Sequence, residues 1–122
     1  MVKSELYVPD RGDVVWLNLN PQSGHEQAGN RPALVLSPLK YNLKVKLAIF
    51  CPITNQIKGY PFEVIIPDGL KVKGAILSDQ VKNLDWQIRK AEFICKLPDY
   101  IINETLSKLG KLLLLTNKFS SI

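Results

Sequence analysis

The segment Val14-Val15-Trp16-Leu17-Asn18-Leu19 follows Gly12-Asp13 and is rich in β-branched, aromatic and aliphatic residues, which predicts a first β-strand. The continuous apolar run Pro32-Ala33-Leu34-Val35-Leu36-Ser37 predicts a buried strand that starts at Pro32, where a missing N–H is tolerated. Further short strands are expected at residues 46–51, 62–66, 74–77, 80–81 and 91–96. Many short strands at nearly regular spacing indicate a small barrel or sandwich.

Polar loops separate these strands. Residues 20–30 contain proline and glycine but no apolar periodicity, so they are expected to form one loop. This loop is long for a compact domain, and long loops tend to be functional or disordered. A second polar loop is expected at 52–60, and Pro67-Asp68-Gly69 indicates a turn.

The hydrophobic period changes near the C-terminus. After Pro98 and Asp99, apolar residues recur at spacings of 4, 3 and 4, which places them on one face of a helix: Ile102, Leu106, Leu109 and Leu113. Proline is accepted in the first turn because the N–H there has no partner within the helix. The apolar stripe is widened by Leu112, Leu114 and Leu115. We expect these leucines in the core, and a subunit contact is the alternative.

The composition excludes several kinds of site. The 122 residues are expected to form one domain, residues 1–122. A single His excludes a mechanism built on two histidines, and two Cys with one His cannot complete a zinc site without carboxylates. We therefore expect no metal and no cofactor. The net charge of +5 suits a polyanion such as nucleic acid or a strongly acidic protein, or it only maintains solubility.

The sequence contains no pattern typical of secretion or of membrane insertion. The start, Met1-Val2-Lys3-Ser4-Glu5-Leu6-Tyr7, lacks an apolar stretch, and the longest aliphatic run, 112–115, is far shorter than the ~20 residues that span a bilayer. We therefore expect a cytoplasmic protein that has no membrane partner. Cys51 and Cys95 lie in apolar runs and are expected to be buried thiols without a disulfide in a reducing cytosol.

Three loops concentrate side chains that suit the recognition of phosphates and bases. Glu26 and Arg31 flank a junction between a loop and a strand, where the guanidinium offers a rigid fork of donors that matches phosphate. Thr54 places a hydroxyl just after a strand. Amide side chains both donate and accept hydrogen bonds, as base reading requires, and they occur at Gln27, Asn30, Asn55, Gln56 and Gln80.

Each of these features also has a simpler structural interpretation. Asn, Gln and Gly are common in turns. Glu26 and Arg31 could form a surface ion pair worth ~0–1 kcal/mol, and Thr54 could only cap a turn. His25, the single histidine, could contact a substrate, although neighbouring side chains in an extended loop diverge. The residues alone leave both interpretations open.

Four segments occur in the order and spacing of the motifs of a known family. They are Tyr7-Val8-Pro9-Asp10-Arg11-Gly12-Asp13-Val14-Val15-Trp16, Gly24-His25-Glu26-Gln27-Ala28-Gly29-Asn30-Arg31-Pro32-Ala33-Leu34-Val35-Leu36-Ser37-Pro38, Lys58-Gly59-Tyr60-Pro61-Phe62-Glu63-Val64 and Ser78-Asp79-Gln80-Val81-Lys82. Through these segments the chain resembles the MazF/PemK toxin family from about Tyr7 to the C-terminal helix. Four ordered motifs are far more specific than any one of them alone.

The resemblance implies a mainly β fold, namely a small SH3-like barrel of the MazF/PemK/CcdB type with a C-terminal helix. It implies a homodimer that binds single-stranded RNA along its interface. It also implies the toxin component of a type II toxin–antitoxin system, inhibited by the acidic tail of a MazE-like antitoxin. The implied activity is that of a sequence-specific, ribosome-independent endoribonuclease, or mRNA interferase, whose products carry a 2′,3′-cyclic phosphate and a 5′-hydroxyl.

The residues of the family's motifs fall on definite positions of this chain. The motif Arg falls on Arg31, the catalytic Thr on Thr54 and the motif Glu on Glu26, which makes these three the expected catalytic residues. The expected RNA contacts are His25, Gln27, Asn30, Asn55, Gln56, Gln80 and Lys82. Two positions depart from the pattern in ways that concern base preference. Asn30 stands where the family often has His, and His25 stands where a small or polar residue is more usual.

The implied products require no nucleophile from the protein and no metal. The ribose 2′-OH attacks the neighbouring phosphate, and DNA lacks that hydroxyl. We expect Arg31 and Thr54 to stabilise the charge that develops on the phosphoryl oxygens. An Arg pKa above about 12 makes proton donation by Arg31 a poor alternative. Glu26 is one candidate for the general base.

Two other functions compete with this interpretation. The CcdB gyrase poisons share the barrel but act through a C-terminal Trp-Gly-Ile, whereas this chain ends in Ser120-Ser121-Ile122. The second alternative is a catalytically silent barrel that binds RNA or peptide. The presence of Glu26, Arg31 and Thr54 argues against that alternative.

Overall fold

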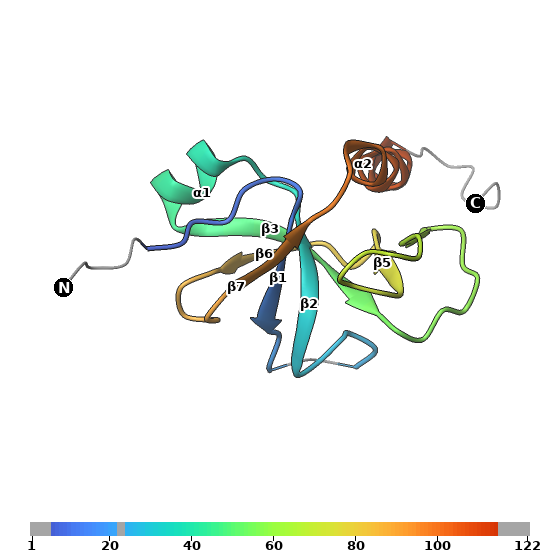
Figure 1. The fold of residues 1–122 in the computed structure, drawn as a ribbon, viewed down its shortest axis with the longest axis horizontal. Helices are drawn as coiled ribbons and strands as arrows, with labels where there is room; N and C mark the ends of the chain where they lie inside the picture. Colours follow the sequence, from blue (N-terminus) through green and yellow to red (C-terminus); the bar gives the residue numbers. More distant parts are fainter. Residues whose placement is uncertain (1–5, 22–23, 115–122) are drawn as a thin grey trace.

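The structure, a computed structural model, describes residues 6–21 and 24–114. Figure 1 shows the strands gathered between two helices, α1 and α2, which lie apart from each other. In chain order the described elements are β1 (Asp13–Asn18), β2 (Asn30–Val35), α1 (Leu39–Val45), β3 (Leu47–Thr54), β4 (Glu63–Ile65), β5 (Ala75–Leu77), β6 (Lys82–Asp85), β7 (Glu92–Lys96) and α2 (Asp99–Leu114).

The strands form one antiparallel sheet in the order β4-β5-β3-β2-β1-β7, and β6 pairs with β3 beside this path. The long strand β3 therefore has two partners along one side: Phe50 pairs with Lys82 of β6, and Ile53 pairs with Ile76 of β5. The expected mainly antiparallel fold with a C-terminal helix is confirmed. Closure of the sheet into a barrel is not detected among the described residues.

Two expectations about the strands are wrong. Residues 80–81 form no strand, because the Gln80 N–H donates to Leu77 O at 3.1 Å in a turn, and β6 begins only at Lys82. The run 46–51 also underestimates β3, which continues to Thr54. That extension matters for function, since it moves Thr54 from a loop into the last position of a central strand.

Pro32 is the third residue of β2 and not its first, contrary to expectation. It lies opposite Trp16 of β1, whereas the pairing of β2 with β3 begins one residue later, at Ala33. Pro32 therefore lies outside the part of β2 that pairs on both sides, which explains why a residue without an N–H is accepted there.

The sequence does not predict helix α1, because this helix has no buried apolar stripe. Its exposed residues include Leu39, Leu43 and Val45. The helix is anchored instead by the buried side chain of Asn42, whose Oδ1 accepts from Ser37 Oγ at 2.5 Å and whose Nδ2 donates to Pro9 O at 2.7 Å. Trp86 Nε1 donates to Asn42 O at 3.1 Å. The helix ends at Lys46 with φ 64°, so the glycine that often marks a helix end is missing.

Alternate residues of the central strands contribute to two apolar clusters, because successive side chains of a strand point to opposite faces. The first, which we call the α2 cluster, includes Val14, Leu34 and Ile53 and is covered by Ile101 and Ile102 of α2. The second, which we call the Trp86 cluster, consists of Val15, Leu17, Leu19, Ala33, Val35, Ala48, Phe50 and Trp86. The side chains of the candidate site continue the face that carries the Trp86 cluster.

Only the first turns of α2 are buried against the sheet. Its buried residues are Ile101, Ile102 and Thr105. The side chain of Leu114 is 82% exposed, so its expected place in the core is wrong. Leu112 is only partly buried, and Leu115 lies outside the described residues. Of the helices in the described ranges, none combines the length and apolarity needed to cross a membrane.

The two cysteines lie in different environments. Cys51 is buried as expected, and burial raises the pKa of its thiol to about 12, with a smaller contribution from the Asp79 carboxylate. Cys95 is only partly buried, contrary to expectation, because it lies in β7 at the edge of the sheet. Both cysteines are free thiols.

A network around the buried carboxylate of Asp13 fixes the segment before β1. The hydroxyl of Tyr7 donates to Asp13 Oδ2 at 2.6 Å, and the Asp10 N–H donates to the same oxygen at 3.0 Å. Lys96 of β7 forms an ion pair with Asp13 Oδ1 at 2.8 Å. Burial of the phenol, followed by its hydrogen bond to Asp13, raises the pKa of Tyr7.

This network predicts a specific dependence of stability on alkaline pH. A tyrosine in the unfolded chain ionises near pH ~10, whereas Tyr7 in the folded chain keeps its proton. Its contribution is therefore present below pH ~10 and is lost as the pH rises above that value. We expect Tyr7→Phe to lower the free energy of unfolding by ~1.5–3 kcal/mol at pH 8, and by less at pH 11.

Urea unfolding at both pH values measures this difference. Tyr100→Phe is the matched control, because Tyr100 is 61% exposed on α2. An equal loss of stability at pH 8 and pH 11 for Tyr7→Phe would show that the phenol proton plays no part.

Candidate active site

The register of β2 and β3 brings Arg31 and Thr54 to the same end of the sheet. Ala33 pairs with Pro52 and Val35 with Phe50, so the same register, continued past the last paired residues, sets Arg31 opposite Thr54. Because side chains alternate along a strand, Arg31 shares the face of Ala33, and Thr54 shares the face of Pro52. Both polar residues therefore lie on the sheet face that carries the Trp86 cluster, each beyond the residues that its own strand contributes to that cluster.

Thr54 is held more firmly than its sequence position suggests. It is the last residue of β3, it is buried, and its Oγ1 accepts a hydrogen bond from the Gln56 N–H at 3.0 Å. Thr54 therefore does cap a turn. That bond uses the hydroxyl oxygen as an acceptor and leaves the hydroxyl able to donate.

Arg31 is half-buried, and the contact it makes fixes the orientation of its guanidinium. Its Nε donates to Ala28 O at 2.9 Å. The guanidinium has five N–H donors, and this is its one hydrogen bond among the described residues, so the donors of the terminal nitrogens can still bind an anion. Glu26, at the other side of the loop, forms an ion pair with Lys82 Nζ at 2.5 Å.

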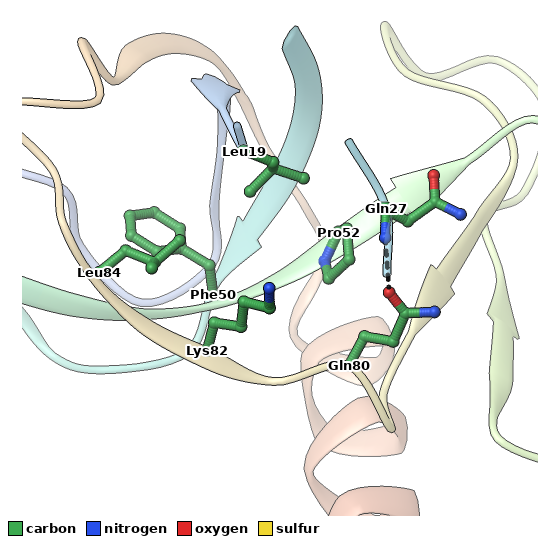
Figure 2. Close-up of a pocket in the computed structure, with 7 residues that line it drawn as sticks. All are labelled: Leu19, Gln27, Phe50, Pro52, Gln80, Lys82 and Leu84. Atoms are coloured by element: carbon green, nitrogen blue, oxygen red, sulfur yellow. Dashed lines mark hydrogen bonds between the residues drawn. The ribbon is translucent and has the colours of Figure 1, made fainter. Parts of the chain in front are cut away.

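Two hydrogen bonds fix the loop between β1 and β2, one to the turn before β6 and one within the loop. The Gln27 N–H donates to Gln80 Oε1 at 3.2 Å, as Figure 2 shows, and the Gly29 N–H donates to Asn20 Oδ1 at 3.0 Å. Figure 2 also shows Pro52 of β3 beside this contact, with Lys82 close by. These bonds place the Gln27 side chain, whose buried Oε1 has no hydrogen-bond partner among the described residues. A buried acceptor without a donor is costly, and a bound ligand could supply the donor.

Beside Thr54 lies a cleft of about 300 Å³. Its lining residues are His25, Gln27, Thr54, Gln56, Lys58, Tyr60, Phe62, Glu63, Leu77, Asp79 and Gln80. The cleft therefore brings together one of the three expected catalytic residues with four expected RNA contacts. A separate small pocket is lined by Leu19, Gln27, Phe50, Pro52, Gln80, Lys82 and Leu84, and its volume of about 10 Å³ is too small for a nucleotide.

The remaining expected site residues lie outside the lining of the cleft: Glu26, Asn30, Arg31, Asn55 and Lys82. Sequence reasoning, in turn, assigned no role to several residues that do line it: Lys58, Tyr60, Phe62, Glu63, Leu77 and Asp79. A signal was available, because most of these residues belong to two of the four quoted motifs.

Gly74 sets the position of the end of β3. Its φ is +114°, and a Cβ there would lie only 2.1 Å from Thr54 O. Ala75, the next residue, pairs with Thr54 in the ladder between β5 and β3. Any side chain at position 74 would therefore push the backbone of Thr54 away from β5.

We predict that Gly74→Ala destabilises the protein by several kcal/mol, because it combines a strained φ with a clash against backbone, each costing about 1–3 kcal/mol. Gly110 is the matched control, since it is in α2 with open space around its Cα. Gly110→Ala should stabilise the chain by ~0.5–1 kcal/mol. Thermal unfolding of the two variants measures the contrast, and a Gly74→Ala protein as stable as the wild type would contradict it.

In the part of the chain that the structure describes, no three His, Cys, Asp or Glu side chains gather closely enough to hold a metal ion. The groups named so far are a guanidinium, a hydroxyl, a carboxylate and several amides. This set can bind an anion, donate hydrogen bonds to it and accept a proton.

The sequence and the fold match a known class of protein. Residues 10–113 match the family described as "PemK-like, MazF-like toxin of type II toxin-antitoxin system". The match covers most of the chain, and the chain belongs to this family.

Individual relatives agree with that assignment. The Endoribonuclease toxin MazF of Escherichia coli (strain K12) is 51% identical over 85 residues, which cover 70% of this chain and 76% of the relative. The Endoribonuclease toxin ChpB of the same strain is 35% identical over 115 residues, covering 89% of this chain and 96% of the relative. The chain is thus a homologue of endoribonuclease toxins of the MazF kind.

Solved structures show the same fold. The crystal structure of MazF (Form-I) from Deinococcus radiodurans superposes with a TM-score of 0.86 at 51% identity, covering 89% of this chain and 99% of that one. A chain of the MazE–MazF (Form-II) crystal structure from the same organism superposes with a TM-score of 0.81 at 51% identity, covering 90% and 99%.

Proposed function

We propose that this toxin is a sequence-specific, ribosome-independent and metal-independent endoribonuclease that cuts single-stranded RNA. The products that the proposal requires carry a 2′,3′-cyclic phosphate and a 5′-hydroxyl. The observation that carries it is the β2–β3 register, which, continued past its last paired residues, sets Arg31 opposite Thr54 on one face of the sheet, where Thr54 lines the cleft.

In the proposed reaction, the ribose 2′-oxygen forms a new bond to its neighbouring phosphorus while the bond from phosphorus to the 5′-oxygen breaks. The 2′-OH loses a proton and the departing 5′-oxygen gains one. Negative charge accumulates on the phosphoryl oxygens, and fixed donors aimed at that charge supply most of the acceleration in such reactions. Arg31 and Thr54 are the donors that the proposal assigns to these oxygens.

Glu26 is our candidate for the group that accepts the proton of the 2′-OH. Its carboxylate is held beside Lys82 by the ion pair across the sheet. Carboxylates are among the side chains that serve as general bases in enzymes.

The amide side chains of the cleft are the proposed readers of base edges. Gln27, Gln56 and Gln80 line the cleft, and the single histidine, His25, lines it as well. Asn30, Asn55 and Lys82 lie outside the lining and are proposed to contact the strand where it leaves the cleft. An RNA strand would supply the donor that the buried Gln27 Oε1 lacks.

We also propose the partners of this protein. Crystal structures of MazE–MazF complexes from Deinococcus radiodurans contain close relatives of this chain. An acidic antitoxin of the MazE kind suits the net charge of +5, and so does the RNA backbone. We further propose that the protein is a cytoplasmic homodimer that binds RNA along the interface between its subunits.

Incubation of the pure protein with long single-stranded RNA in the presence of EDTA tests the proposed function. Discrete cuts at a common short sequence support it, and sequencing of the cut ends identifies that sequence. Intact RNA would favour the alternatives, a silent RNA-binding protein or a gyrase poison of the CcdB kind. The gyrase-poison alternative depends on the C-terminal residues 120–122, which lie outside the described residues.

We predict that Arg31→Ala lowers kcat/KM for RNA cleavage by ~10²–10³-fold, as the loss of one donor to a developing oxyanion does. Lys44→Ala is the control, because it removes an exposed positive charge on α1, away from the cleft. Nearly full activity of a folded Arg31→Ala protein would remove Arg31 from the site.

We predict a similar loss of rate for Thr54→Ala, with RNA binding largely retained. Thr54→Ser is the matched control, since it keeps the hydroxyl that Gln56 N–H binds and should retain most of the activity. Cleavage kinetics together with binding to an RNA that cannot be cut measure both effects. Parallel loss of binding and rate would make Thr54 a docking residue.

A further inference from the structure

The segment between β3 and β4 presents two aromatic rings to the cleft, and the proposed chemistry does not use them. Tyr60 and Phe62 both line the cleft, with ring centroids 6.0 Å apart and an interplanar angle of 56°. Tyr60 is 53% exposed, and neither ring belongs to the α2 cluster or the Trp86 cluster. An exposed aromatic ring inside a polar cleft needs an explanation other than core packing.

The segment that carries these rings is held in a defined shape by Glu63. The carboxylate of Glu63 is buried, with 5% of the residue exposed. Its Oε2 accepts from the Lys58 N–H at 3.1 Å, and its Oε1 accepts from the Gly59 N–H at 2.9 Å. The Glu63 N–H in turn donates to Tyr60 O at 3.1 Å. Each residue of the segment 58–60 is thus hydrogen-bonded to Glu63.

Glycine at position 59 makes the shape of this segment possible. Gly59 has φ +81°, a region that L side chains rarely adopt, so the conformation that the carboxylate binds depends on it. Glu63 is itself fixed from the other side, because Lys108 of α2 donates to Glu63 O at 2.8 Å. The support of the aromatic segment therefore reaches from the cleft to the C-terminal helix.

We propose that Tyr60 and Phe62 form a stacking platform for one base of the RNA strand. Glu63 is the positioning residue that holds this platform against the cleft. The inference rests on the proposed function, and it adds a stacking contact with the face of a base to the hydrogen bonds that the expected base readers make with its edge. A base that stacks on an aromatic ring contributes affinity whatever its identity, because every base has a flat π-face.

The surroundings of the platform match a single nucleoside. The cleft volume of about 300 Å³ lies at the lower end of the range for small-molecule sites, which suits one nucleoside better than a stretch of strand. Gln27 and Gln56 line the same cleft and offer donors and acceptors for the edge of a stacked base. Lys58 lines it too and offers a cation for the adjoining phosphate.

A binding experiment with modified RNA tests the platform. The probe is a short RNA oligonucleotide that spans the mapped cut site and carries a 2′-deoxy sugar at the scissile nucleotide, so that it binds without being cut. Fluorescence anisotropy measures its Kd for the wild type, Tyr60→Leu and Tyr60→Phe. Tyr100→Leu is the control, because Tyr100 is exposed on α2 and does not line the cleft.

We expect Tyr60→Leu to weaken binding by about 5- to 150-fold, the range for loss of one stacked base at ~1–3 kcal/mol and 1.4 kcal/mol per tenfold. Tyr60→Phe, which keeps the ring, should weaken binding far less than Tyr60→Leu, and Tyr100→Leu should bind like the wild type. Each base of the oligonucleotide is then replaced in turn by an abasic residue. At the position of the stacked base, this replacement should weaken binding to the wild type but should not weaken binding to Tyr60→Leu any further. That loss of additivity identifies the stacked base.

The role of Glu63 is tested by the same comparison of abasic penalties in the wild type and in a variant. A purely structural role of Glu63 would not change the penalty at one position alone. Glu63→Gln can accept only one of the two N–H bonds, so the abasic penalty should shrink at the same position and stay unchanged at the others. Independent penalties at every position for Tyr60→Leu, or unchanged binding, would contradict the platform while leaving the nuclease intact. A wild type that neither cuts nor binds RNA would contradict the proposed function and the platform together.

Discussion

The pairing register of β2 with β3 is the constraint on which the site depends. A strand that slips by one residue turns every side chain to the opposite face. In the observed register, Ala33 lies opposite Pro52, and the Trp86 cluster packs on the sheet face to which Ala33 points. The burial of that cluster therefore also fixes where Arg31 and Thr54 lie, since both lie on the same face of the same two strands. Hydrophobic packing positions the catalytic groups that we propose, and no direct bond between them is required.

Much of the architecture could be predicted from the sequence because the strands have strong local signals. The β-branched run of β1 and the apolar run of β2 are short, continuous and bounded by turn residues, and the 4-3-4 spacing marks α2. Helix α1 could not be predicted, because its stability comes from the buried amide of Asn42, which bonds to distant parts of the chain. Burial of Leu114 was predicted wrongly, because the helical period indicates a face but not the extent of the sheet beneath it.

The candidate site could be predicted in part from the sequence. The roles of its residues could be predicted only through the family resemblance. Thr54, His25 and three glutamines do line one cleft. The aromatic segment at Tyr60 was not assigned a role, because its meaning depends on Glu63, whose carboxylate is buried by the fold and binds two backbone N–H groups. A charged residue in a strand gives no sign, in sequence, that it supports a neighbouring segment.

The central claim is that Arg31 and Thr54 act on the same phosphate. The most direct test is a double-mutant cycle, with kcat/KM for one RNA oligonucleotide measured for the wild type, Arg31→Ala, Thr54→Ala and the double variant. Groups that act together on one transition state are strongly non-additive. The account predicts that the double variant is little worse than the more damaged single variant. A double variant whose loss equals the product of the two single losses would show that the residues act independently and would contradict the account.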